Sequence, residues 1–326
     1  LHVRSRRQRQ MCIRDREMTS MNLHQRSHLY FYICIILTTI CMGSSFPTGK
    51  YLISIEHVPP MLLGGWRFTI AGFIILLVLF LKRGVKNTLP SIDHNSYKGF
   101  IFVVTIGLLQ TAGTMGLLNI AMSLGVSSSM SAVLLFTNPL WLAVLAHFIL
   151  KDRLTMIKMV TLVIGVVGVT ICLGLDRTLL GWGACVALLG SLCWSCNTVV
   201  TKQFKFDKGA WVLTGWQLLF GGIIMFLISQ LLGEHYHIEQ LNGWGWLWFW
   251  WLVFPASIGS FGLWFSSLNL RGATISSSFL FLVPLFSTIF SIIGLGEPFT
   301  LHIMIGGLCV VIALIIINYS PHHLRI

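Results

Sequence analysis

The chain has 326 residues, of which 55% are hydrophobic and only 10% charged, and its mean hydropathy is +0.81. Soluble domains carry about 25% charged residues, so the composition excludes an ordinary soluble protein and indicates an integral membrane protein. The net charge of +12 does not indicate nucleic-acid binding, because the basic residues lie in short breaks between apolar runs.

The first 28 residues are basic and polar, and the run from Met11 to Arg16 resembles translated adaptor sequence. We therefore expect residues 1–28 to be a cytoplasmic tail that is partly non-native, with the natural start at Met18 or Met21.

Ten apolar runs follow, and a helix needs about 20 such residues to cross the hydrocarbon layer. They cover residues 29–49, 61–81, 98–118, 127–149, 156–174, 181–201, 211–232, 246–268, 274–294 and 302–319. The sequence predicts an all-α integral membrane protein with ten transmembrane helices and a short C-terminal tail over 320–326.

The loop charges predict the orientation. If the N-terminus is cytoplasmic, the inner loops and the C-terminal tail hold twelve Lys and Arg residues, whereas the outer loops hold only Lys50 and Arg177. Cytoplasmic loops are enriched in Lys and Arg. We expect both termini in the cytoplasm, and the tryptophan cluster over 244–251 at the outer membrane surface.

An internal repeat relates the two halves of the chain. Five features recur in order at spacings of 145 to 152 residues: Cys41 with Cys193, Gly65 with Gly215, Asn119 with Asn269, Pro139 with Pro284, and Asp152 with Glu297. Each half contains five predicted spans, an odd number, so the second copy is expected to be inverted in the membrane. Inverted repeats of this kind are common in secondary transporters. We predict a first repeat over 29–174 and a second over 181–319.

The motifs within each half resemble a known family. The segment from Gly43 to Lys50, and Trp66-Arg67-Phe68, resemble the start of an EamA-type unit of the drug/metabolite transporter superfamily. The segments 136–155 and 281–300 resemble the end of that unit. The resemblance implies ten helices around a central cavity and the export of amino acids, other metabolites or toxic compounds. The chain departs from the pattern at Met42, Asp152 and Gln217.

Arg67 is the one Lys, Arg, Asp or Glu well inside a predicted span. A charge near the bilayer centre costs about 2.5–3.5 kcal/mol on insertion scales. Arg67 is therefore either a contact for a substrate anion or a gate, or a structural partner of carbonyls or of an outer carboxylate such as Glu56.

Neutral polar residues at mid-depth are the other candidates for substrate binding. Gln110, Asn138 and Asn197 carry amides that need partners away from water, and a kink at Pro139 would free a carbonyl beside Asn138. These residues either bind substrate in a wet cavity or hold helices together. Trp194 and Trp264 are candidates for apolar cavity walls, with ordinary packing as the alternative.

The sequence therefore predicts a secondary transporter of the cell (inner) membrane that exports a small metabolite, amino acid or amphiphilic compound by alternating access. We expect no enzyme activity, cofactor, metal site or nucleic-acid partner, and only a small-molecule substrate and the lipid bilayer as partners. A proton-coupled multidrug antiporter is one alternative, but it would need a carboxylate in the first span. A lipid-handling membrane protein is another, but it would need a cluster of His, Asp or Glu at one membrane face.

Overall fold

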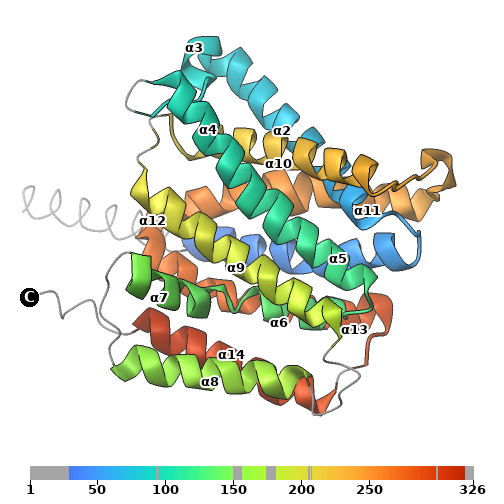
Figure 1. Cartoon of the computed structure of the whole chain (residues 1–326), viewed down its shortest axis with the longest axis vertical. Coiled ribbons are helices and arrows are strands. Elements are labelled where there is room, and N and C mark those ends of the chain that lie inside the picture. Colours follow the sequence, from blue (N-terminus) through green and yellow to red (C-terminus); the bar gives the residue numbers. More distant parts are fainter. Residues whose placement is uncertain are drawn as a thin grey trace, which may run out of the picture.

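The computed structural model describes residues 29–92, 95–149, 156–173, 181–204, 206, 208–298 and 300–319. These residues form helices and short connections (Figure 1), with no strand among them beyond one isolated bridge between Ile92 and Asn95. The predicted tails, and Asp152, lie outside the described residues.

The elements follow one another as a series of helices. In chain order they are Leu29–Ser54, α2 (Pro60–Arg83), α3 (Val85–Thr88), α4 (Ser96–Ile106), η1 (Gly107–Gly116), α5 (Leu117–Ser123), α6 (Ser128–Leu135), α7 (Asn138–Ile149), α8 (Met156–Leu173), α9 (Trp182–Gln203), α10 (Ala210–Leu231), η2 (Ile238–Gln240), α11 (Gly243–Val253), η3 (Phe254–Gly259), α12 (Ser260–Ser278), η4 (Phe279–Phe281), α13 (Leu282–Leu295) and α14 (Leu301–Tyr319).

Seven helical stretches among the described residues are long and apolar enough to cross a membrane. They are Leu29–Ser54, Pro60–Arg83, Ser96–Ser123, Ser128–Ile149, Trp182–Gln203, Ala210–Leu231 and Gly243–Gly272. The other three predicted spans contain shorter apolar helices, Met159–Gly168, Leu282–Leu295 and Leu301–Ala313. The predicted ninth span is shortened because Gly272, with φ of 78°, interrupts α12 and the 3₁₀ turn η4 precedes α13. The count of ten spans stays a prediction.

The helix ends follow the local sequence. Pro60 opens α2, where its missing N–H is not needed, and the Glu234 carboxylate accepts from the backbone N–H groups of Met61 and Leu62. Gly84 ends α2 with φ of 76°, a conformation that favours glycine. Gly233 follows α10, the corresponding helix of the second half, with φ of 68°. Both helices thus end beside a glycine with positive φ, directly after α2 and one residue beyond Leu232 after α10.

Helices α2 and α10 pack with their backbones in close contact. A methyl group added at Gly72 would lie 2.8 Å from the carbonyl oxygen of Gly215, and one at Gly65 would lie 3.0 Å from the backbone nitrogen of Phe226. A methyl group at Gly215 would meet the side chain of Leu76 at 2.9 Å. As residue numbers rise along α2 from Gly65 to Gly72, the contacted residues of α10 fall from Phe226 to Gly215, so the two helices run antiparallel. Small residues allow such close approach between membrane helices.

Two further groups of helices complete the arrangement. Helices α8 and α14 lie side by side along one edge of the molecule, at the bottom of Figure 1. The continuous rod formed by α4, η1 and α5 crosses the molecule diagonally beside α9 (Figure 1). A cluster of buried apolar residues joins α2, α10 and α11, and it includes Phe68, Met225 and Leu252. Phe68 also borders a cavity.

Candidate functional site

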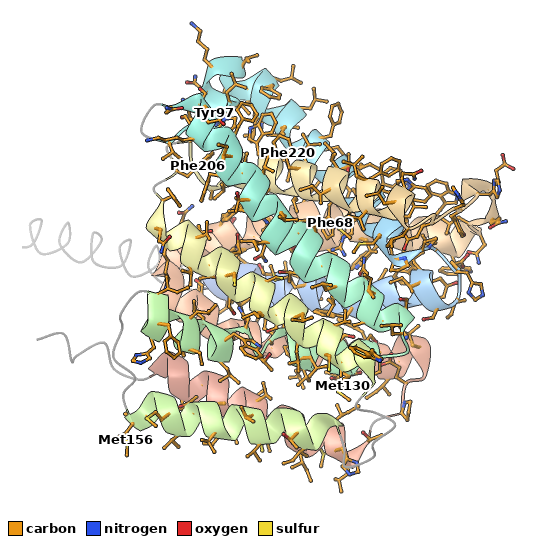
Figure 2. All side chains as sticks on the ribbon, in the orientation of Figure 1. Phe68, Tyr97, Met130, Met156, Phe206 and Phe220 are labelled. Atoms are coloured by element: carbon orange, nitrogen blue, oxygen red, sulfur yellow. The ribbon has the colours of Figure 1, made fainter. Side chains whose placement is uncertain are left out.

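A cavity of about 110 Å³ lies between helices of both halves. One water needs about 10–15 Å³ on this measure, so the cavity has room for several waters or a small organic molecule. It is lined by Met42, Ser45, Phe46, Arg67, Phe68, Gln110, Thr111, Met115, Leu118, Asn119, Met122, Leu135, Phe136, Trp194, Gln217, Leu218, Ala256, Ser257, Ser260, Phe261 and Val283. Phe68 is labelled near the centre of Figure 2.

Many of the lining residues come in pairs related by the internal repeat. Four pairs are 150 residues apart and one pair is 152 apart: Arg67 with Gln217, Phe68 with Leu218, Gln110 with Ser260, Thr111 with Phe261, and Met42 with Trp194. These spacings match those of the sequence repeat over the same segments. The same positions of both halves thus form the two sides of the cavity.

Two π-helical segments carry several of these side chains. Segment η1 (Gly107–Gly116) presents Gln110 and Thr111, and η3 (Phe254–Gly259) presents Ser257. The Ser257 hydroxyl donates to the carbonyl of Leu252, five residues earlier, at 2.8 Å. Short π segments inside α-helices are frequent at functional sites. Nothing in the sequence analysis predicted them.

Arg67 reaches the cavity from α2. Its Nε donates to the Ser257 Oγ at 3.0 Å, and its guanidinium lies 4.6 Å from the ring centre of Phe68. Among the described residues, no other group accepts a hydrogen bond from this side chain and no carboxylate pairs with it. Glu56, the carboxylate suggested as a partner, instead accepts from Asn242 and from the Tyr51 hydroxyl.

Two of the three predicted amide side chains, Gln110 and Asn197, form a hydrogen bond with each other. Asn197 Nδ2 donates to Gln110 Oε1 at 2.9 Å, and Gln110 lines the cavity with Asn197 behind it. The Asn197 Oδ1 is buried and has no partner among the described residues. The side chain of Gln217, from α10, borders the cavity and has no hydrogen bond to a described residue.

Asn138 lies at a break between α6 and α7. Its side chain is not among the cavity-lining groups, but its carbonyl accepts from Ser195 Oγ at 2.7 Å. Ser191 Oγ donates to the carbonyl of Leu135 at 3.0 Å and bonds to the hydroxyl of Thr137. Serines of α9 thus satisfy the groups that the break frees. A role for the Asn138 side chain in substrate binding stays a prediction.

The two predicted tryptophans have different positions. Trp194 lines the cavity, and its ring packs edge-on against Phe136 with ring centres 5.6 Å apart. Trp264 is half-buried on α12 and is not among the lining residues. The aromatic wall of the cavity is therefore formed by Trp194 with Phe136.

Carboxylates at loop ends bind helix N-termini. Glu297, after α13, accepts from the N–H and hydroxyl groups of both Ser128 and Ser129 at 2.8–3.3 Å, where α6 begins. Nearby, Lys50 Nζ donates to the carbonyl of Met122 at 2.7 Å.

In the loop after α10, burial and then the charge of Glu56 raise the pKa of Tyr236. Within the described residues, no group of three His, Cys, Asp or Glu is placed to hold a metal ion.

The comparisons with known proteins identify the family. A model of the EamA-like transporter family matches residues 29–174 and 181–319. The chain belongs to the EamA-like transporter family. This confirms the family resemblance predicted from the sequence motifs, and with the apolar helices it makes the protein a membrane protein of a transporter family.

Relatives extend the assignment over most of the chain. It is 28% identical over 285 residues to the uncharacterized transporter YoaV of Bacillus subtilis, covering 85% of this chain and 92% of that protein. It is 31% identical over 185 residues to the uncharacterized inner membrane transporter YedA of Escherichia coli, covering 56% of each. One crystal structure with 20% sequence identity covers 90% of this EamA chain and 96% of its own, with a TM-score of 0.58, which shows a shared fold.

Several lining residues were not singled out from the sequence as site residues, among them Ser257, Ser260 and Gln217. The sequence marks Gln217 only as a departure from the family pattern. The repeat itself contained the signal, because shifting Arg67 and Gln110 by 150 residues gives Gln217 and Ser260.

Proposed function

We propose that this protein is a secondary transporter of the cell membrane that exports a small metabolite, amino acid or amphiphilic compound by alternating access. The observation that carries the proposal is the cavity between the two halves, lined by residue pairs at the repeat spacing. Secondary transporters with internal repeats hold their substrates where the repeats meet. Both halves would then move around a substrate held by side chains from each.

The proposal includes ten spans arranged as two inverted five-helix units with both termini in the cytoplasm. The antiparallel packing of α2 and α10 supports the inversion. The repeat relates Gly65 to Gly215 and Leu76 to Phe226, and the contact of Gly65 with Phe226 is matched by the contact of Gly215 with Leu76. Reciprocal contacts of this kind are expected across a two-fold axis. In a membrane, corresponding helices that run antiparallel belong to units of opposite orientation.

The test is transport by the purified chain in liposomes loaded with a mixture of small metabolites. We expect selective loss of some components compared with protein-free liposomes. Ser45→Trp should abolish this efflux, because the indole would occupy the cavity that Ser45 borders. Leu77→Trp is the matched control, since Leu77 lies in α2 with 43% of its surface exposed on the outside of the helix bundle. Equal efflux from the wild type, Ser45→Trp and protein-free liposomes would refute the proposal.

A further inference from the structure

Arg67 is the one charged residue that lines the cavity among the residues described. The other lining groups are apolar side chains, hydroxyls and amides. A cation enclosed by protein and lipid is costly unless an anion pairs with it. The described residues supply no such anion, so the cavity has an unmatched positive charge.

The guanidinium also has unused hydrogen-bonding capacity. Arginine carries five N–H donors. Among the described residues, only the Arg67 Nε has a hydrogen-bond acceptor, the Ser257 hydroxyl. The two terminal nitrogens can bind both oxygens of a carboxylate through two parallel hydrogen bonds. Their four N–H groups have no protein acceptor within the described part of the chain.

The rest of the cavity suits the remainder of such a ligand. Gln110 and Gln217 bring amide groups to the same cavity as Arg67, and amide nitrogens donate further hydrogen bonds to an anion. Trp194 and Phe136 form an apolar wall, which would hold a hydrocarbon or aromatic body.

We propose that the substrates of this protein are small monocarboxylates with an apolar body, bound through a bidentate pair between the carboxylate and Arg67. This inference rests on the proposed transport function and names the substrate class. One guanidinium neutralises one carboxylate, whereas a phosphate dianion would keep an uncompensated charge in the cavity. A dicarboxylate is excluded in the same way, because the repeat partner of Arg67 is the neutral Gln217.

The test uses a panel of carboxylates from butyrate to 3-phenylpropanoate, each paired with its neutral primary amide. Binding to the purified full-length chain is measured by thermal shift and isothermal titration. We expect at least one carboxylate to bind at least tenfold more tightly than its amide. Arg67→Gln should remove this preference. Adding Gln217→Arg to that variant returns the guanidinium to the corresponding position of the other half and should restore it. The Leu77→Trp control should keep the wild-type preference.

The inference is overturned if no carboxylate in the panel binds, or if Arg67→Gln keeps the preference for carboxylates. It is also overturned if the amides of the panel bind and leave loaded liposomes while the carboxylates do not. That last result, with efflux still blocked by Ser45→Trp, would leave the proposed transport function standing and reject the substrate class alone.

Discussion

The close contact of α2 with α10 predicts the effect of a single methyl group. In Gly72→Ala, the new methyl would meet the backbone nitrogen of Leu219 first, and it would lie 2.8 Å from both the Gly215 carbonyl oxygen and the Leu219 Cα. Ordinary contacts begin near 3.4 Å, so the helices must separate by at least about 0.6 Å. The atoms that must move belong to backbone, which cannot rotate away. Overpacking of this kind costs about 1–3 kcal/mol, and we expect that loss in the free energy of unfolding.

The assay is unfolding of the purified protein in mixed micelles by titration with a denaturing detergent. Gly222→Ala, at the position related to Gly72 by the repeat, should cause a similar loss. Its methyl would meet the backbone nitrogen of Thr69 and would lie 2.9 Å from the carbonyl carbon of Phe68. Gly294→Ala in α13 is the control: nothing lies within 4 Å of its new methyl, and alanine favours a helix over glycine by about 0.5–1 kcal/mol. Equal stability of the Gly72 and Gly294 variants would refute the close backbone contact.

Three other predictions concern the loops and the driving force. Glu297→Ala should lower the free energy of unfolding by about 1–3 kcal/mol, because the N–H groups of Ser128 and Ser129 lose their acceptor. Glu239 is exposed, so Glu239→Ala should change the free energy of unfolding by less than about 0.5 kcal/mol in the same titration. Reporter fusions should place residue 86 inside and residue 239 outside, and residues 86 and 205 on opposite faces would contradict the inverted repeat. Transport in liposomes should reach equilibrium without a pH gradient. Proton relays use ionisable residues within the membrane, whereas Glu56, Glu234 and Glu297 lie beyond the ends of apolar helices. Accumulation of substrate that is driven by a pH gradient and abolished by His147→Gln would contradict this prediction.

The sequence predicted an all-helical membrane fold because membrane spans are long apolar runs, while the count of ten spans stays a prediction. Of the candidate site residues, Arg67, Gln110 and Trp194 line the cavity, and they were found because polar and large aromatic residues stand out in such runs. The sequence did not predict which way Asn138 faces. A helix that is apolar on every side has no periodic signal to separate the lipid face from the cavity face. The break at Phe136 and Thr137 interrupts the helix just before Asn138, so depth alone could not place its side chain.

The π segments were hidden for a different reason. A π turn differs from an α turn by one residue in the hydrogen-bond spacing, and its side chains have the same composition as the helix around it. Thr114 donates to the carbonyl five residues earlier, as Ser257 does, yet a hydroxyl in an apolar run has several common acceptors. Only the three-dimensional backbone distinguishes these segments.

The line of close contact between α2 and α10, at Gly65, Gly72, Gly215 and Gly222, also has a mechanical consequence. Two helices whose backbones touch cannot slide along each other, because each backbone fills the hollow left by a glycine of the other. They can still tilt about the line of contact, since a tilt changes the separation little at that line and more with distance from it. If the two halves move as proposed, they would therefore rotate relative to each other about the line of contact between α2 and α10. Helices α8 and α14, packed against each other along the edge of the molecule, would then limit how far this rotation goes.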